Sequence, residues 1–182
     1  AIAVVSMLIV MLIIMCGVRS CGRRYIQNKI IYNGYKIPNI IHQTVKSKNA
    51  LDYTLRENIY SWKQLNDGFE YNLYDDEECV KFLKKHFTED HVATFNGLKA
   101  GAAKADFFRL CVLYIKGGVY VDIDMRCLVP LFSWIEQNDT FIIPKDGDTE
   151  VIDLFQAFIA STPRNPILLK GINKIMHNVK NK

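Results

Sequence analysis

Gly117-Gly118-Val119-Tyr120-Val121-Asp122-Ile123-Asp124 is the stretch of sequence that decides the fold. Two glycines stop a helix, and a strand rich in β-branched residues follows them. Because side chains alternate across a strand with a period of two, the valines and Ile123 are predicted to face the core. The opposite face then carries Tyr120, Asp122 and Asp124. The stretch therefore predicts a buried strand that presents two carboxylates at its carboxyl end.

Paired carboxylates at the end of an apolar strand favour a metal site. Two carboxylates on one face repel each other and lose hydration when buried, and a cation beside them removes that cost. Hard oxygen ligands suit Mg²⁺ or Mn²⁺, which often bind through one or two carboxylates and the phosphates of a substrate. We therefore predict that Asp122 and Asp124 bind Mn²⁺ or Mg²⁺. The alternative is a strand that runs into a solvated turn.

The longer segment from Ala105 to Asp124, ADFFRLCVLYIKGGVYVDID, resembles the signature of the DxD-containing sugar transferases of glycosyltransferase family 32. That family includes the yeast initiating α-1,6-mannosyltransferase and the mannosyl-inositol-phosphoceramide synthases, and the clostridial toxin glucosyltransferases resemble it distantly. The resemblance implies a GT-A nucleotide-sugar-binding fold. It also implies a retaining enzyme that moves a hexose (mannose, glucose or galactose) from a UDP- or GDP-sugar to a glycan or lipid hydroxyl.

The resemblance also implies roles for individual residues. Asp124 is the expected direct metal ligand, and Asp122 is expected to reach the ribose, the sugar or, through water, the metal. Asp106 and Arg109 lie three residues apart on one helix face, where an exposed ion pair of little energetic worth is the structural alternative. In the toxin relatives the matching pair holds hydroxyls of the donor sugar. The catalytic set is therefore Asp106, Arg109, Asp122 and Asp124.

Further substrate contacts are expected at the ends of other strands. Tyr120 is expected to lie against the nucleoside, and His42 either contacts the nucleotide or closes its strand as a structural residue. The acidic run that starts at Asp75 is typical of a helix first turn, although it also matches a family segment that borders the nucleotide. Relatives usually carry a tryptophan where this chain has Val45. That difference lowers the expected affinity for the base.

The order of predicted elements gives an α/β sandwich with one central, mainly parallel sheet. Strands are predicted at 38–44, 69–74 and 140–143, and helices at 51–65, 75–86, 97–116 and 165–179. Residues 88–96 are predicted to form a loop with a helical turn. Residues 37–182 make up the predicted GT-A-like glycosyltransferase domain, which either is a minimal member of the family or continues further in the natural protein.

The first residues, AIAVVSMLIVMLIIMCGV, are almost wholly apolar and predict a transmembrane signal anchor over 1–18, with a cleaved signal as the alternative. A basic stem follows over 19–36. Its arginines argue for a cytoplasmic catalytic domain, whereas the resemblance argues for a lumenal one in the Golgi or endoplasmic reticulum. Cys16 and Cys21 are either palmitoylated or unmodified.

Composition limits the other function classes. The net charge of +4 and the pI near 8.7 are mild, and no basic stripe interleaved with aromatic residues supports nucleic-acid binding. Two alternatives to the transferase remain. One is a membrane-tethered protein that binds nucleotide sugar without turnover, which Val45 and the short C-terminal part suggest. The other is a metal-dependent phosphohydrolase, although the sequence lacks the additional ligands of a two-metal site.

Overall fold

The computed structural model describes residues 34–146 and 153–181. All of them except Gly34 belong to one compact unit, Tyr35–Lys182. The predicted transmembrane anchor and almost all of the predicted stem fall outside the described residues. Within the described ranges, no helix is both long and apolar enough to cross a membrane.

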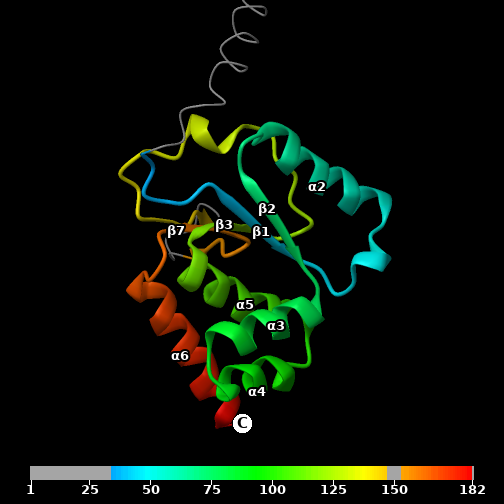
Figure 1. Ribbon diagram of the computed structural model, residues 1–182, viewed down its shortest axis with the longest axis vertical. Coiled ribbons are helices and arrows are strands. Elements are labelled where there is room, and N and C mark those ends of the chain that lie inside the picture. Colours follow the sequence, from blue (N-terminus) through cyan, green and yellow to red (C-terminus); the bar gives the residue numbers. More distant parts are fainter. Residues whose placement is uncertain (1–33, 147–152, 182) are drawn as a thin grey trace, which may run out of the picture. The chain divides into compact units, whose positions relative to one another are not determined.

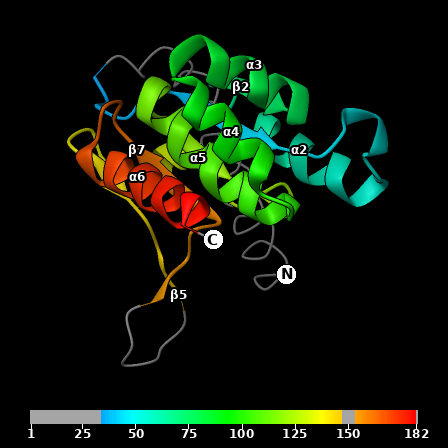
Figure 2. The same cartoon turned by 90° about the horizontal axis from the view of Figure 1, so that it is seen from below.

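The centre of the unit is a sheet with the strand order β2-β1-β3-β7-β4 (Figure 1). Its strands are β1 (Ile40–Thr44), β2 (Glu70–Tyr74), β3 (Gly118–Val121), β4 (Phe141–Ile142) and β7 (Phe158–Ser161). β1 pairs in parallel with β2 and β3, while β7 pairs antiparallel with β3 and β4. All of these strands except β7 therefore run in one direction, which confirms the mainly parallel sheet. A small separate ribbon joins β5 (Lys145–Asp146) to β6 (Asp153–Leu154), and Figure 2 shows β5 leaving the layer of helices.

Helices cover both faces of this sheet. They are α2 (Tyr53–Leu65), α3 (Asp76–His86), α4 (Glu89–Gly97), α5 (Gly101–Lys116) and α6 (Pro166–Lys180), with 3-10 turns η2 (Lys48–Ala50) and η3 (Leu131–Ser133). One apolar cluster joins α3, α4, α5 and α6 to the sheet, and a second joins α2 and the segment around η3 to the opposite face. Figure 1 shows α3, α4, α5 and α6 together, with α2 on the other side of β2.

Two boundaries differ from the sequence-based prediction. Residues 89–97 form α4 instead of a loop, and the main helix begins at Gly101 instead of Gly97. In α4 only Val92, Thr94 and Phe95 are buried, so the apolar repeat is too short to reveal a helix. The segment between α4 and α5 includes the extended Leu98 and Ala100, which separates the two helices.

The strand β3 confirms the predicted alternation only as far as Val121. Tyr120 packs in the cluster on the side of α5, whereas Val119 and Val121 pack on the side of α2, so both faces of β3 are buried. The strand then ends, and the backbone N–H of Met125 donates to the carbonyl of Asp122 at 3.1 Å. The two aspartates therefore lie on a turn, which we call the DxD turn (122–125). Ile123, predicted to face the core, lines a cavity instead.

The two glycines make the sharp change from α5 to β3 possible. Gly117 and Gly118 have φ values of 66° and 96°, a region that side-chain-bearing residues rarely adopt. A Cβ atom on Gly118 would lie 2.5 Å from the carbonyl oxygen of Ile40, and one on Gly117 would lie 2.7 Å from Pro163 Cδ. The backbone of Gly118 therefore packs directly against the backbone of Ile40, which lets β3 lie against β1.

We predict that Gly118→Ala lowers the free energy of unfolding by roughly 3 kcal/mol, because backbone strain and overpacking act together. Urea denaturation followed by circular dichroism measures the change. Gly101→Ala is the matched control, since a Cβ atom there meets no heavy atom within 4 Å. It should leave stability equal or raise it by up to about 1 kcal/mol. Equal stability of the two variants would contradict this account of the junction.

Candidate active site

A cavity of about 740 Å³ opens where β1 and β3 end. Several segments line it: the end of β1 and the residues after it, the first turn of α3, α4 with Lys99, the first half of α5, the DxD turn, the β5–β6 ribbon and the loop before β7. The lining residues that matter below are Thr44, Val45, Lys46, Asp76, Lys99, Lys104, Asp106, Arg109, Asp122, Ile123, Asp124, Asp146 and Gln156. Ligand crevices of open α/β sheets lie at this edge.

Arg109 is held in the cavity wall by several partners at once. Its side chain is only 4% exposed, and Nη2 lies 2.9 Å from Oδ1 of Asp106 and 3.0 Å from Oδ1 of Asp122. Nη1 donates to the carbonyl of Gln156, and the guanidinium lies 4.9 Å from the centre of the Tyr120 ring. One cation therefore joins α5, the DxD turn and the loop before β7, and it sets the positions of both carboxylates.

The carboxyl group of Asp122 is electrostatically strained. Burial raises its pKa above the usual range, and the nearby Asp124 and Asp106 act in the same direction, while Arg109 opposes them. A net rise despite a direct contact with Arg109 means that the charged form is incompletely compensated.

The backbone of the DxD turn is held by side chains that the sequence analysis did not select. Gln43 donates to the carbonyl of Asp122 at 3.2 Å, Asn58 to that of Asp124 at 2.9 Å, and Trp62 Nε1 to that of Met125 at 2.8 Å. Asn58 and Trp62 are four residues apart, so they lie on one face of α2. The sequence signal for Asn58 is its position: it is a polar residue one helical turn before a tryptophan expected in the core.

The structure brings the four residues of the predicted catalytic set to the cavity. Asp106, Arg109, Asp122 and Asp124 all line it. The structure places the other three predicted contacts elsewhere. Asp75 is the N-cap residue of α3. Its carboxylate accepts a hydrogen bond from the N–H of Glu78, and the carboxylate of Glu78 accepts one from the N–H of Asp75. This is the alternative that the acidic run suggested.

Tyr120 and His42 are both fully buried and absent from the cavity wall. The Tyr120 hydroxyl shares a 2.7 Å hydrogen bond with Thr44 Oγ1, and the ring supports Arg109. His42 Nε2 donates to the carbonyl of Gly117 at 3.0 Å, and the Tyr74 hydroxyl donates to Nδ1 at 3.3 Å. Both side chains are therefore held within the layers of the fold, and a donor contact of either one stays a prediction.

Three lysines in the cavity complete its charge pattern. Lys104 is paired, with Nζ 2.6 Å from Oδ2 of Asp76, and lies 5.0 Å from the centre of the Phe95 ring. Lys46 and Lys99 have no ion-pair partner among the described residues. After internal pairing, the cavity therefore presents free ammonium groups together with the exposed carboxylate of Asp124.

Comparison with known proteins agrees with this geometry. Residues 53–141 match the family described as the glycosyltransferase sugar-binding region containing a DXD motif. This match confirms the resemblance predicted from the sequence. The chain is 36% identical over 132 residues to the uncharacterized glycosyltransferase L373 of Acanthamoeba polyphaga mimivirus, covering 72% of this chain and 52% of that protein.

It is also 30% identical over 142 residues to inositol phosphoceramide mannosyltransferase 1 of Schizosaccharomyces pombe, covering 77% of this chain and 43% of the relative. The chain thus spans about half or less of these two relatives. Among solved structures, the PaToxG glycosyltransferase has a similar fold, with a TM-score of 0.60, 18% identity and coverage of 92% of this chain and 70% of that one. The fold is therefore similar to that of a known glycosyltransferase.

We predict that His42 makes stability depend on pH. Burial lowers its pKa from 6.5 to about 4. Between these two pH values, His42 is protonated in the unfolded chain and neutral in the folded protein. Stability therefore falls as pH decreases through that window, by at most about 1.4 kcal/mol per pH unit from this group. His42→Gln should flatten the slope of unfolding free energy against pH. An unaltered slope in His42→Gln would place the pH dependence elsewhere.

Proposed function

We propose that this protein transfers a hexose from a nucleotide diphosphate sugar to a hydroxyl group of a glycan or lipid acceptor. The observation that carries the proposal is Arg109, fixed between Asp106 and Asp122 in the wall of a cavity that the exposed Asp124 borders. The DXD-containing family match and the names of the relatives support it.

Asp106 and Arg109 are proposed to hold the donor sugar. Asp106 uses Oδ1 for Arg109, which leaves Oδ2 to accept a hydrogen bond from a sugar hydroxyl. Because the guanidinium is anchored on three sides, the carboxylate is already oriented before the donor arrives. A pair that is fixed in this way positions the anomeric carbon near the DxD turn. The sugar can be mannose, glucose or galactose.

The carboxylates of the DxD turn fit a divalent cation that is shared with a substrate. Within the described ranges no cluster of three or more His, Cys, Asp or Glu side chains could hold a metal alone. Mg²⁺ and Mn²⁺ commonly bind through one or two carboxylates plus phosphates, so Asp124, with Asp122 beside it, suits such an ion. When bound, the ion would neutralise charge that develops on the diphosphate.

The chain's own cations are proposed to assist the leaving diphosphate. Lys46 and Lys99 line the cavity, and free ammonium groups are good ligands for phosphate oxygens. The acceptor oxygen forms its bond to the anomeric carbon as the bond to the diphosphate breaks. The diphosphate leaves with the bonding electrons, and its departing oxygen takes the proton of the acceptor hydroxyl. Retention of configuration is part of the proposal because the family that the sequence resembles retains it.

The proposed setting is a lumenal domain anchored in a Golgi or endoplasmic reticulum membrane.

We predict that Val45→Trp tightens nucleotide binding. Val45 lines the cavity, and aromatic stacking on a base is worth roughly 1–3 kcal/mol per base. Isothermal titration with UDP and GDP in Mn²⁺ measures the effect. Val129→Trp, at a valine that is 55% exposed outside the cavity, is the matched control and should change nothing. If the folded Val45→Trp variant binds no better, another group already occupies the position of the base.

The decisive prediction concerns Asp124→Asn, which should abolish metal-dependent hexose transfer while the fold is retained. Asparagine keeps the shape of the side chain but removes the charge that holds a hard cation. Removing repulsion with Asp122 should leave the metal-free melting temperature equal or slightly higher. A clear fall in that melting temperature with transfer preserved would contradict the metal site. In the wild type, hexose release to water that an added acceptor does not redirect would indicate the hydrolase alternative.

A further inference from the structure

Asn138-Asp139-Thr140 is the only Asn-x-Ser/Thr sequence in the 182 residues of the chain. Such a sequence is the acceptor for N-linked glycans, which are bulky and strongly hydrated and therefore need a surface position. Because the pattern is short, the structure must decide whether this asparagine can serve. The side chain has to be exposed, its amide has to be free, and a glycan on it must displace nothing.

Asn138 lies in an exposed turn between η3 and β4. The N–H of Asp139 donates to the carbonyl of Glu136 at 3.2 Å, and the N–H of Glu136 donates to Oδ2 of Asp139 at 2.8 Å. Asn138 and Thr140 are both exposed. Figure 1 shows this part of the chain, in yellow, as a loop at the outer boundary of the unit. A bulky group attached here therefore extends into solvent.

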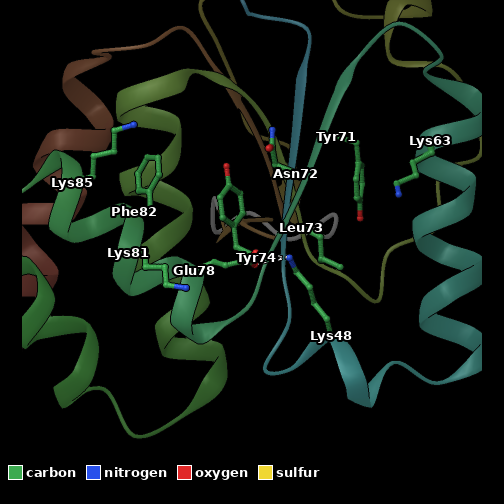
Figure 3. Close-up of a pocket in the computed structure, with 10 residues that line it drawn as sticks. All are labelled: Lys48, Lys63, Tyr71, Asn72, Leu73, Tyr74, Glu78, Lys81, Phe82 and Lys85. Atoms are coloured by element: carbon green, nitrogen blue, oxygen red, sulfur yellow. Dashed lines mark hydrogen bonds and ion pairs between the residues drawn. The ribbon is translucent and has the colours of Figure 1, made fainter.

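The side-chain amide of Asn138 has no hydrogen-bond partner among residues 34–146 and 153–181. Other asparagines use their amides within the fold. Asn58 donates to a carbonyl of the DxD turn at 2.9 Å, and Asn66 donates at 2.9 Å to a carbonyl near the end of α2. Asn72, which Figure 3 shows on β2, donates to a glutamate of the same strand at 2.8 Å. Modification of Asn138, unlike that of these three, breaks no hydrogen bond of the described structure.

Thr140 is also available, because the fold uses its backbone and not its hydroxyl. Its carbonyl accepts from the N–H and the hydroxyl of Thr162, at 2.9 and 3.3 Å, and from Asn165 Nδ2 at 3.3 Å. Its hydroxyl makes no hydrogen bond to another residue in the described part of the chain. The hydroxyl is the group that defines the third position of the acceptor sequence. The fold therefore holds the backbone of Thr140 and leaves this group accessible.

We propose that Asn138 is a site of N-linked glycosylation, which rests on the lumenal setting proposed above. Nδ2 of Asn138 forms a bond to the anomeric carbon of an oligosaccharide carried on a lipid diphosphate. The bond from that carbon to the diphosphate breaks, and the diphosphate leaves with the bonding electrons and takes the proton that the amide nitrogen loses. The described lining of the donor cavity includes no residue from 136–140, so a glycan here leaves the cavity open.

The same three residues would need no glycan if their role were only to close the turn. Closure of the turn uses the backbone and the carboxylate of Asp139. It uses neither the amide of Asn138 nor the hydroxyl of Thr140. The two roles are therefore separated by substitutions that change only that amide or that hydroxyl.

The test is synthesis of the full chain in a cell-free extract with and without endoplasmic reticulum microsomes, followed by gel electrophoresis before and after treatment with peptide N-glycosidase F. We expect a microsome-dependent increase in mass that the glycosidase removes. Asn138→Gln and Thr140→Ala should abolish it completely, whereas Thr140→Ser, which keeps a hydroxyl, should retain it. Asn178→Gln is the matched control, at an exposed asparagine outside any acceptor sequence, and should change nothing.

A second acceptor separates failure of this site from failure of the lumenal setting. Leu51→Thr places a threonine two residues after the exposed Asn49, and Leu51 belongs to neither apolar cluster. A glycan on this variant but none on the wild type would overturn the site and leave the lumenal setting in place. No glycan on either would overturn both. A mass increase that survives in Asn138→Gln would also overturn the site. Hexose transfer is measured separately, so none of these outcomes removes the proposed reaction.

Discussion

The contact of Arg109 with two carboxylates is the interaction on which the candidate site depends. A buried guanidinium is costly unless it is paired and fully hydrogen-bonded, and here Asp106, Asp122 and the carbonyl of Gln156 satisfy it. These partners come from three separate segments of the chain. The site is therefore complete only when all three segments are in their folded positions.

The rest of the fold holds these partners in place. β3 lies between two helical layers, so its end is fixed from both faces. Gln43, Asn58 and Trp62 then fix the carbonyl groups of the DxD turn from β1 and α2. The aspartate side chains are consequently carried by a turn whose backbone has little freedom. Such preorganisation is what electrostatic catalysis requires, since groups that are already oriented need not reorganise during the reaction.

Local patterns predicted a large part of this arrangement. Gly117-Gly118 and the valines of β3 predicted the junction and the strand, and spacing placed Asp106 and Arg109 on one helix face. The local pattern could not reveal that the alternation stops at Val121, because the turn after it is fixed by Gln43, Asn58 and Trp62, which are distant in sequence. His42 and Tyr120 show the same limit. Their residue types suit a ligand, but no short pattern encodes their burial between the layers of the fold.

The glycine junction has a consequence for how the length of this chain can vary. Arg109 and Asp122 are 13 residues apart in sequence and in direct contact, and the chain between them is a helical stretch, a turn without room for side chains, and a strand locked to its neighbours. One residue added to or removed from the helical part would rotate Arg109 about the helix axis by about 100° relative to the strand. The number of residues between the two side chains is therefore as much a part of the site as their identity. Insertions that a surface loop would absorb have no place in this segment.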